Sequence, residues 1–281
     1  MGMNPITEAA NILAEANAVL IGAGAGLSAA AGLDYTDEIR FAARFPAMLQ
    51  YGARNQYQLM GYPFADEALK WGYLAATLDD VYRSGVTQVY QDLLTIVDKR
   101  DYFVMTSNVD RYFHKNGFVD DRIYTPQGDY ELLQCQTPCH RAVWDAKPIV
   151  AALVEHIDPQ TQKVTDSSLL PVCPNCGENV YMNVRGGDWF MDAPYVEQAN
   201  AISLWLDRVR HERLAVLEIG AGFNTPGVIR GPMETIGTTW PNADFIRVNI
   251  ADMQAPAGTV CVAEPADRAL QLILQQLTQS S

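Results

Sequence analysis

Short apolar runs alternate with segments of helical periodicity in the first and last parts of the chain. Apolar runs of this length are typical of strands buried on both faces of a parallel sheet, and they fall at 18–21, 102–106, 215–219, 245–249 and 259–262. The predicted helices are 6–16, 86–98, 202–210 and 265–278, one more from about Ala29 and another opening at Thr225–Pro226. Strands that alternate with helices predict an α/β fold with a Rossmann-like, doubly wound parallel sheet.

Two segments interrupt this alternation. Residues 34–85 are rich in aromatic residues and alanine with few strand signals, and we predict a mostly helical insertion there. Residues 124–194 are short, irregular pieces that carry four of the five cysteines, which predicts a small zinc-binding module. The Rossmann-like part is then made of 1–33, 86–123 and 195–281, and the whole chain forms one domain.

Composition narrows the function classes. The chain has 281 residues, 48% of them hydrophobic and 19% charged, so it can bury a sizeable core and is not globally disordered. Its formal net charge of −13 argues against a nucleic-acid partner, whose phosphates would be repelled. The longest apolar stretch, 18–33, is glycine-rich and too short for a membrane span, and we see no secretion signal. We therefore expect a cytoplasmic protein with no membrane partner and reduced thiols.

A glycine loop follows the first predicted strand. Gly24-x-Gly26-x-x-Ala29 fits the dinucleotide fingerprint, in which glycines let the backbone approach a pyrophosphate. The alternative is a tight strand-to-helix turn that needs glycines for steric reasons alone. The dehydrogenase form of the fingerprint also has an acidic residue about 20 positions later. Residues 41–50 contain none, which disfavours an ordinary hydride-transfer domain.

Four cysteines fall in two close pairs. Cys173 and Cys176 are separated by Pro-Asn and followed by glycine, a spacing that lets two thiolates reach one tetrahedral zinc ion. Cys135 and Cys139 have three residues between them, and 33 residues separate the two pairs. The alternatives are four scattered thiols or a degraded site, with His140 as a substitute ligand. A closed four-ligand site leaves no open position, so we predict structural zinc without a catalytic role.

The glycine loop belongs to a series of motifs that resembles the sirtuin family. Residues 24–33 (GAGLSAAAGL) resemble the sirtuin loop GAGxSxxxGI, and 106–110 (TSNVD) resemble TQNID at a strand end. Residues 220–226 (GAGFNTP) resemble the later loop GTSxxxP, and 248–249 (VN) resemble the Ile-Asn that holds the adenosine ribose. The matches recur in order over nearly the whole chain, so the resemblance implies a single sirtuin-type catalytic domain that binds NAD in the cleft between its parts.

The chain departs from the sirtuin deacylases at three places. Residues 124–128 read YTPQG where those enzymes carry His-Gly, so Gln127 stands at the catalytic histidine. Residues 34–37 read DYTD instead of PDFR, and 184–188 read VRGGD instead of the VxFGE that clamps an acyl-lysine peptide. This combination is similar to the class M, macrodomain-linked sirtuins of microbes, which carry Gln there and a long aromatic insertion such as 51–71.

Members of that group are protein ADP-ribosyltransferases that modify a lipoylated glycine-cleavage-H-like carrier protein. The resemblance therefore implies protein mono-ADP-ribosylation, with that carrier and a macrodomain hydrolase as partners. The chemistry of Gln127 agrees, because deacylation needs a general base near neutrality and an amide cannot accept that proton. The alternatives are a weak NAD-dependent deacylase, an NAD glycohydrolase and a non-catalytic NAD sensor.

The resemblance also implies a role for each matched residue. Asn108 would hold the ribose or a water at the glycosidic carbon, and Gln127 would hydrogen-bond the ribose hydroxyls. Asp110 would bind the nicotinamide amide, although Asn or Asp after a strand is also a common helix cap. The full set of expected NAD contacts is Gly24, Ala25, Gly26, Ser28, Tyr35, Arg40, Ser107, Asn108, Asp110, Gln127, Gly220, Ala221, Gly222, Asn249 and Val262.

Overall fold

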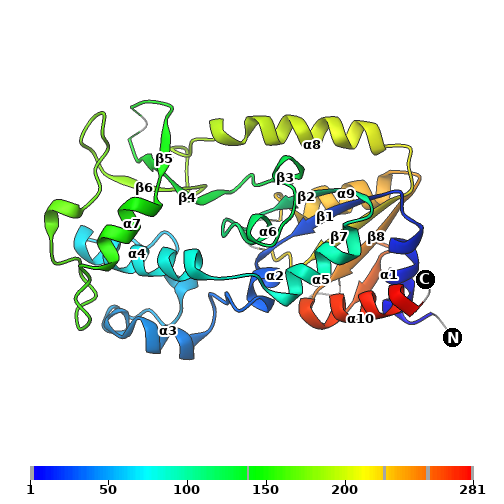
Figure 1. Cartoon of the computed structure of the whole chain (residues 1–281), viewed down its shortest axis with the longest axis horizontal. Helices are drawn as coiled ribbons and strands as arrows, with labels where there is room; N and C mark the ends of the chain where they lie inside the picture. The colour runs from blue at the N-terminus through cyan, green and yellow to red at the C-terminus, as the bar shows by residue number, and fades with distance from the viewer. Residues whose placement is uncertain (1–2, 138, 224–225, 251–253, 280–281) are drawn as a thin grey trace. The chain divides into compact units, whose positions relative to one another are not determined.

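A six-stranded parallel sheet forms the centre of one compact unit of the chain. The structure is a computed structural model that describes residues 3–137, 139–223, 226–250 and 254–279. The first unit consists of 1–33, 85–127 and 195–281, and its strand order is β3-β2-β1-β7-β8-β9 (Figure 1). The order runs outward from the neighbours β1 and β7, which makes the point between them the switch point of a doubly wound sheet. The predicted Rossmann-like fold is confirmed.

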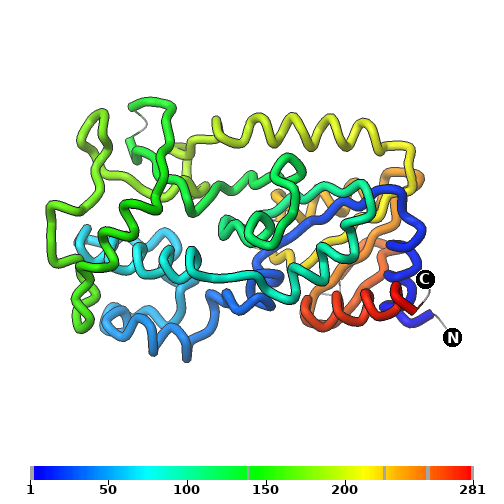
Figure 2. The backbone as a smooth tube through the Cα atoms, viewed as in Figure 1, coloured from blue at the N-terminus to red at the C-terminus, as the bar shows by residue number. Residues whose placement is uncertain are grey.

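The elements of the first unit follow the predicted alternation, and segments distant in sequence lie side by side in the sheet (Figure 2). The strands are β1 (Ala18–Ala23), β2 (Asp101–Thr106), β3 (Ile123–Tyr124), β7 (Leu214–Ile219), β8 (Ala243–Val248) and β9 (Val260–Val262). The helices are α1 (Pro5–Glu15), α2 (Ala25–Ala30), α5 (Gln88–Val97), α6 (Tyr112–Lys115), α8 (Val196–Val209), α9 (Arg230–Thr239) and α10 (Ala266–Gln279), with the 3-10 turn η3 (Asp120–Arg122). The 3-10 turn η5 (Ala193–Tyr195) spans the boundary between the two units.

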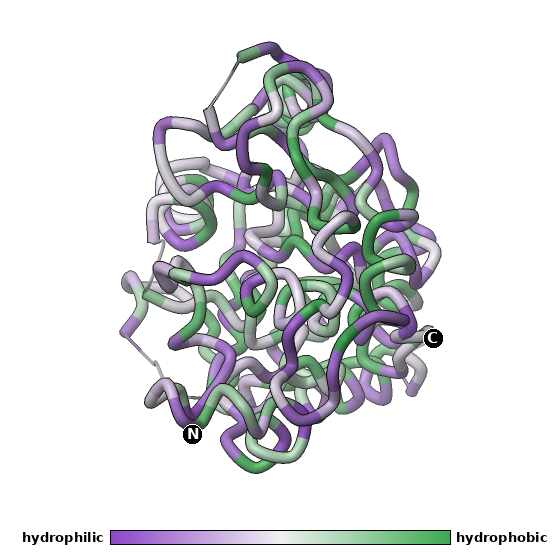
Figure 3. The backbone as a smooth tube through the Cα atoms, turned by 90° about the vertical axis from the view of Figure 1, so that its left-hand side faces the viewer, coloured by the Kyte–Doolittle hydropathy of each residue, from purple (hydrophilic) through white to green (hydrophobic). Residues whose placement is uncertain are grey.

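The core of this unit lies on both faces of the sheet. Every residue of β1 and β7 is buried, as expected for central parallel strands. On one face Leu20 and Val216 pack with Trp205 of α8 and Met233 of α9. Helices α1, α5 and α10 pack together as a separate layer. Hydrophobic and hydrophilic stretches are interleaved along the trace (Figure 3).

Three helix starts differ from the sequence prediction by about four residues or more. Helix α2 begins at Ala25 rather than near Ala29, because Gly24 alone makes the turn out of β1. Helix α8 begins at Val196 rather than at the predicted 202. Its first turns are polar and bury little surface, so the sequence shows no hydrophobic periodicity there. Of the predicted start at Thr225–Pro226, Thr225 lies outside the described residues. Residues 226–229 form turns, and α9 begins at Arg230.

The second unit combines residues 34–84 and 128–194. Its helices are α3 (Glu38–Arg44), α4 (Glu67–Arg83) and α7 (Lys147–Val154), with the 3-10 helices η1 (Pro46–Tyr51), η2 (Gln56–Leu59) and η4 (Ser167–Leu169). A three-stranded antiparallel sheet has the order β5 (Val143–Asp145), β4 (Gly128–Cys135), β6 (Val180–Val184). Helices α4 and α7 pack on one another, and the Tyr82 hydroxyl donates to the carbonyl of Tyr130 at 2.7 Å. The helical segment and the cysteine-bearing segment thus share one core.

Candidate functional site

The sirtuin-like motifs of the first unit gather at one edge of its sheet. The last residues of the central strands are in register, with Ala23 opposite both Thr106 and Ile219, and Ile219 opposite Val248. The loops that follow these strands therefore leave the sheet at the same level. This carboxyl edge, at the switch point between β1 and β7, is where open α/β sheets bind their ligands. The loops that leave the sheet at this edge begin with Gly24, Ser107, Gly220 and Asn249.

The glycine loop and the loop after β7 lie back to back. Gly26 N–H donates to the carbonyl of Gly220 at 3.0 Å, and Gly220 has a φ of +61°. A Cβ on Gly24 would meet the Cα of Ala221 at 2.6 Å, and one on Gly26 would meet the Cα of Gly220 at 2.7 Å. The glycines are therefore needed for steric reasons where two backbones approach one another, as the turn interpretation of the fingerprint requires. The same close approach brings the loops after β1 and β7 together at the candidate site.

Gly24→Ala tests this close approach. The added methyl would push against backbone rather than a flexible side chain, so we expect the free energy of unfolding to fall by about 1–3 kcal/mol. Gly222→Ala is the matched control, because a Cβ there meets nothing within 4 Å. Urea denaturation followed by circular dichroism measures both variants. Equal midpoints for the two would contradict the packing described.

Polar side chains from three elements converge beneath the glycine loop. Asn108 is 9% exposed and donates from Nδ2 to the carbonyl of Gly24 at 3.0 Å. The Ser28 hydroxyl donates to Asp110 Oδ2 at 2.5 Å, and Asp110 Oδ1 accepts from Tyr112 N–H at 2.9 Å. The glycine-loop motif (24–33) and the motif after β2 (106–110) thus meet in one buried network, as their resemblance to the sirtuin loops implies. The second oxygen of Asp110 accepts from the N–H of Tyr112, the first residue of α6, although the N-cap residue of that helix is Arg111.

Tyr90 is a member of this network that the sequence did not single out. It is fully buried on α5, and its hydroxyl lies 3.4 Å from Ser28 Oγ. Burial raises its pKa well above the ordinary value of 10.0. The hydroxyl is therefore protonated and can support Ser28. In the sequence Tyr90 is one apolar position of an amphipathic helix, and helical periodicity does not show which ring carries a buried hydroxyl.

The buried carboxyl of Asp110 makes stability depend on pH. Burial raises its pKa above 3.8, although the Ser28 hydroxyl and the Tyr112 N–H oppose the shift by stabilising the charged form. A raised native pKa means that the unfolded chain loses this proton first. Protonated Asp110 therefore contributes its full stabilisation below the ordinary pKa of a carboxyl, and this stabilisation is lost as the pH rises through the pKa of Asp110 in the folded protein.

Asp110→Asn should remove this loss, because an amide has nearly the same shape and does not titrate. We expect the variant to gain stability relative to the parent as the pH rises from about 4, the ordinary carboxyl pKa, towards 8. Chemical denaturation across this range measures it, with Asp98→Asn at the exposed end of α5 as the control. A difference between Asp110→Asn and the parent that stays constant with pH would contradict the assignment.

The remaining expected NAD contacts divide between the two units. Gln127 is half-buried at the end of the first unit, after a Thr125 whose N–H donates to Gln198 Oε1 of α8 at 3.0 Å. Ala25, Gly222 and Val262 lie at the carboxyl ends of β1, β7 and β9. Tyr35 and Arg40 belong to the second unit, where the Tyr35 hydroxyl donates to the Tyr130 hydroxyl at 3.4 Å. The structure therefore gathers the predicted set at one sheet edge, apart from these two residues.

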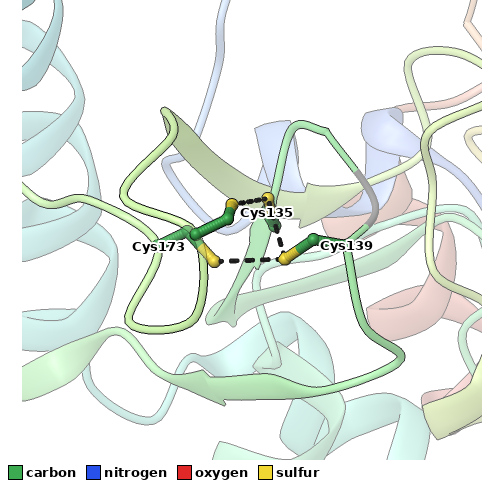
Figure 4. A group of neighbouring side chains, drawn as sticks. Cys135, Cys139 and Cys173 are labelled. Atoms are coloured by element: carbon green, nitrogen blue, oxygen red, sulfur yellow. Dashed lines mark hydrogen bonds between the residues drawn. The ribbon is translucent and has the colours of Figure 1, made fainter.

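The four paired cysteines form one cluster in the second unit (Figure 4). Their Sγ atoms all lie within 4.8 Å of one another, and three separations are 3.6 Å (Cys135–Cys176), 3.8 Å (Cys135–Cys139) and 3.6 Å (Cys139–Cys173). Tetrahedral zinc with Zn–S bonds of about 2.3 Å sets sulfurs about 3.8 Å apart. The scattered-thiol alternative is therefore wrong. The cluster fits a structural zinc ion without His140 as a ligand.

Comparison with known proteins relates the chain to ADP-ribosyltransferases. It is 41% identical over 240 residues to a "Probable bifunctional ADP-ribose hydrolase/ADP-ribosyltransferase" of Fusarium oxysporum f. sp. cubense, a match that covers 83% of this chain and 39% of that protein. It is 27% identical over 239 residues to a protein ADP-ribosyltransferase of Staphylococcus aureus, covering 84% of this chain and 75% of that protein. The chain thus spans about two fifths of the length of the fungal relative. No protein-family model matches it.

Solved structures with the same fold are Sir2 enzymes. One, studied for the mechanism and regulation of Sir2 enzymes, aligns with a TM-score of 0.59 and 17% identity over 99% of each chain. A Sir2 homolog–NAD complex aligns with a TM-score of 0.59 and 14% identity over 99% of this chain and 95% of the other. The chain therefore has the sirtuin fold, and the predicted resemblance is confirmed. Among the described residues, none of the helices has the length and apolar character that a membrane crossing requires.

Proposed function

We propose that the chain is an NAD-dependent protein mono-ADP-ribosyltransferase. The feature that carries the proposal is Gln127, which follows β3 and, by the resemblance of residues 124–128 to the sirtuin motif, takes the place of the catalytic histidine of the deacylases. Both curated relatives are named as ADP-ribosyltransferases, which supports the same activity. NAD would bind at the carboxyl edge of the first unit, across the loops that follow β1 and β7.

The chemistry requires one bond to break and one to form. The bond between the nicotinamide nitrogen and C1′ of the ribose breaks, and nicotinamide leaves with the electron pair. A nucleophile of the acceptor protein then bonds to C1′ and loses its proton to solvent. Asn108, held by the carbonyl of Gly24, would orient the ribose at C1′, and Gln127 would hydrogen-bond the ribose hydroxyls. Positive charge develops on the ribose as nicotinamide leaves, and fixed dipoles whose negative ends face developing positive charge can supply a large part of such a rate enhancement.

Gln127 also argues against efficient deacylation, because an amide cannot act as the general base. A deacylase must remove a proton from a ribose hydroxyl so that its acyl intermediate can rearrange, and histidine suits that task near neutral pH. An amide offers hydrogen bonds only. Losing a general base typically costs about 100- to 10,000-fold in rate. Direct transfer of ADP-ribose to a protein does not need the rearrangement, so Gln127 is compatible with it.

The proposed acceptor is a lipoylated glycine-cleavage-H-like carrier protein, and the proposed second partner is a macrodomain hydrolase that reverses the modification. The resemblance to the class M sirtuins supports the carrier. The name of the fungal relative, which pairs an ADP-ribose hydrolase with an ADP-ribosyltransferase in one chain, supports the hydrolase. Zinc would be held by the four cysteines of the second unit as a structural ion.

Chromatography of the NAD-derived products tests the proposed reaction class. We expect nicotinamide release that depends on the carrier. The ADP-ribose part of NAD should then be found in the protein fraction and not free in solution. Free ADP-ribose in the absence of carrier would indicate a glycohydrolase, and an acyl-ADP-ribose product from an acetyl-lysine peptide would indicate a deacylase. Intact NAD in every reaction, with measurable NAD binding, would indicate a sensor. Any of these three results would overturn the proposal.

A further inference from the structure

A buried ion pair crosses the two strands that lead into the candidate site. Glu218 of β7 and Arg247 of β8 are direct partners in the parallel register, and both side chains are 0% exposed. Arg247 Nε lies 2.6 Å from Glu218 Oε1, and its NH2 group lies 3.0 Å from Oε2, a bidentate pair. Burying two charges costs so much solvation that a pair of apolar residues is often as stable or more so. Fold stability alone therefore does not account for this pair.

The guanidinium of Arg247 also reaches beyond the sheet. Its NH2 group donates to Glu234 Oε1 of α9 at 2.6 Å, and its NH1 group donates to the main-chain carbonyl of Gln254. Arg230, 4% exposed at the start of α9, donates to the same carbonyl at 3.1 Å. Two buried guanidinium groups thus converge on one peptide oxygen. A carbonyl held in this way fixes the position of Gln254.

The same cluster is tied to three expected NAD contacts. Asn249, two residues after Arg247, donates from Nδ2 to the carbonyl of Ala221 at 3.0 Å. Arg230 NH1 lies 3.5 Å from that carbonyl oxygen. The N–H of Gly220 donates to the carbonyl of Val248 at 3.0 Å. The loop after β7 and the backbone after β8 are therefore linked to each other and to the buried pair.

We propose that Arg247, with Glu218 beneath it and Arg230 beside it, is a positioning residue for the adenosine half of NAD. It does not touch the ligand. It holds Gln254 and, through the end of β8, Asn249 at the separation from Ala221 that binding requires. This inference rests on the proposed function only in naming NAD as the ligand, because binding can be measured without transfer.

The double variant Glu218→Leu/Arg247→Met tests this role. It removes both charges and leaves no unpaired buried ion, so it should fold. We expect the dissociation constant for ADP-ribose, measured by calorimetry, and the KM for NAD to rise about tenfold while kcat changes less than twofold. Arg230→Met should raise the dissociation constant by a smaller factor in the same direction. Unchanged circular dichroism would show that folding is not the cause.

A matched control breaks an ion pair at the opposite end of the same sheet. Arg122→Met removes one of the two arginines that pair with Asp101 at the amino end of β2, where the Arg122–Asp101 distance is 2.5 Å. It should leave ADP-ribose binding unchanged. Parent-like binding by the folded double variant, or equal weakening by the control, would overturn the positioning role. Absence of transfer with measurable ADP-ribose binding would contradict the proposed function but leave this role open to the same test.

Discussion

Asn108→Ala is expected to lower ADP-ribosyl transfer about 100- to 1,000-fold, the usual effect of losing one fixed polar group at a reacting centre. Asn108 is buried; its side-chain amide donates to the carbonyl of Gly24 at 3.0 Å, and its main-chain N–H donates to Thr106 Oγ1 at 3.0 Å. The amide is thus fixed at the point where the glycine loop meets the end of β2. Initial rates of carrier modification at saturating NAD measure the effect on kcat.

Asn116→Ala is the matched control for that prediction. Asn116 is another buried asparagine of the same unit, 2% exposed, and it donates to the carbonyl of Tyr112 at 2.8 Å and accepts from Thr87 N–H at 2.8 Å. It should cost stability without lowering the rate per folded molecule. If Asn116→Ala lowers kcat as much as Asn108→Ala does, the loss reflects general damage, and the role of Asn108 at the ribose is wrong.

Removing zinc is expected to unfold the second unit. Structural zinc contributes an apparent free energy of about 10 kcal/mol or more at neutral pH, which exceeds what most small units can lose. The cluster joins the end of β4 to two loops, through Cys135, Cys139, Cys173 and Cys176. Metal analysis should find one zinc per chain. A strong chelator should then remove amide-exchange protection over 128–184 while protection of the first-unit strands persists.

Cys261→Ser provides the control for the metal site. Cys261 lies on β9 in the first unit, outside the cluster, so this variant should keep one zinc per chain and normal protection. Cys173→Ser should lose the metal. A chelated protein whose protection over 128–184 is unchanged would contradict a structural zinc ion and leave the four thiols without the proposed role.

The architecture was predictable because its signals are local. Each of the five predicted strands is an apolar run that the sheet buries, and the strand-glycine-helix unit at 18–30 follows directly from its residues. The four-cysteine cluster follows from thiolate spacing, although 33 residues separate the pairs. The candidate site could be located at the carboxyl edge because Gly24, Asn108 and Gly220 each come directly after or near the end of a predicted strand.

Other features depend on packing that a single sequence does not display. Glu218 and Arg247 read as single polar interruptions in two apolar strands, and only their register makes them a buried pair. The polar first turns of α8 carry no hydrophobic periodicity, so its start was missed. The shared core of residues 34–84 and 128–194 joins segments distant in sequence, which composition cannot pair.

The most direct test of the account is intact-protein mass spectrometry of a lipoylated glycine-cleavage-H-like carrier and an acetyl-lysine peptide, each incubated with NAD and this protein. The carrier should gain the mass of one ADP-ribose, and the peptide should stay acetylated. Gln127→Ala and Asn108→Ala should strongly lower the rate at which the adduct forms. A deacetylated peptide with no carrier adduct would contradict the account, because it would require a general base where the chain has Gln127.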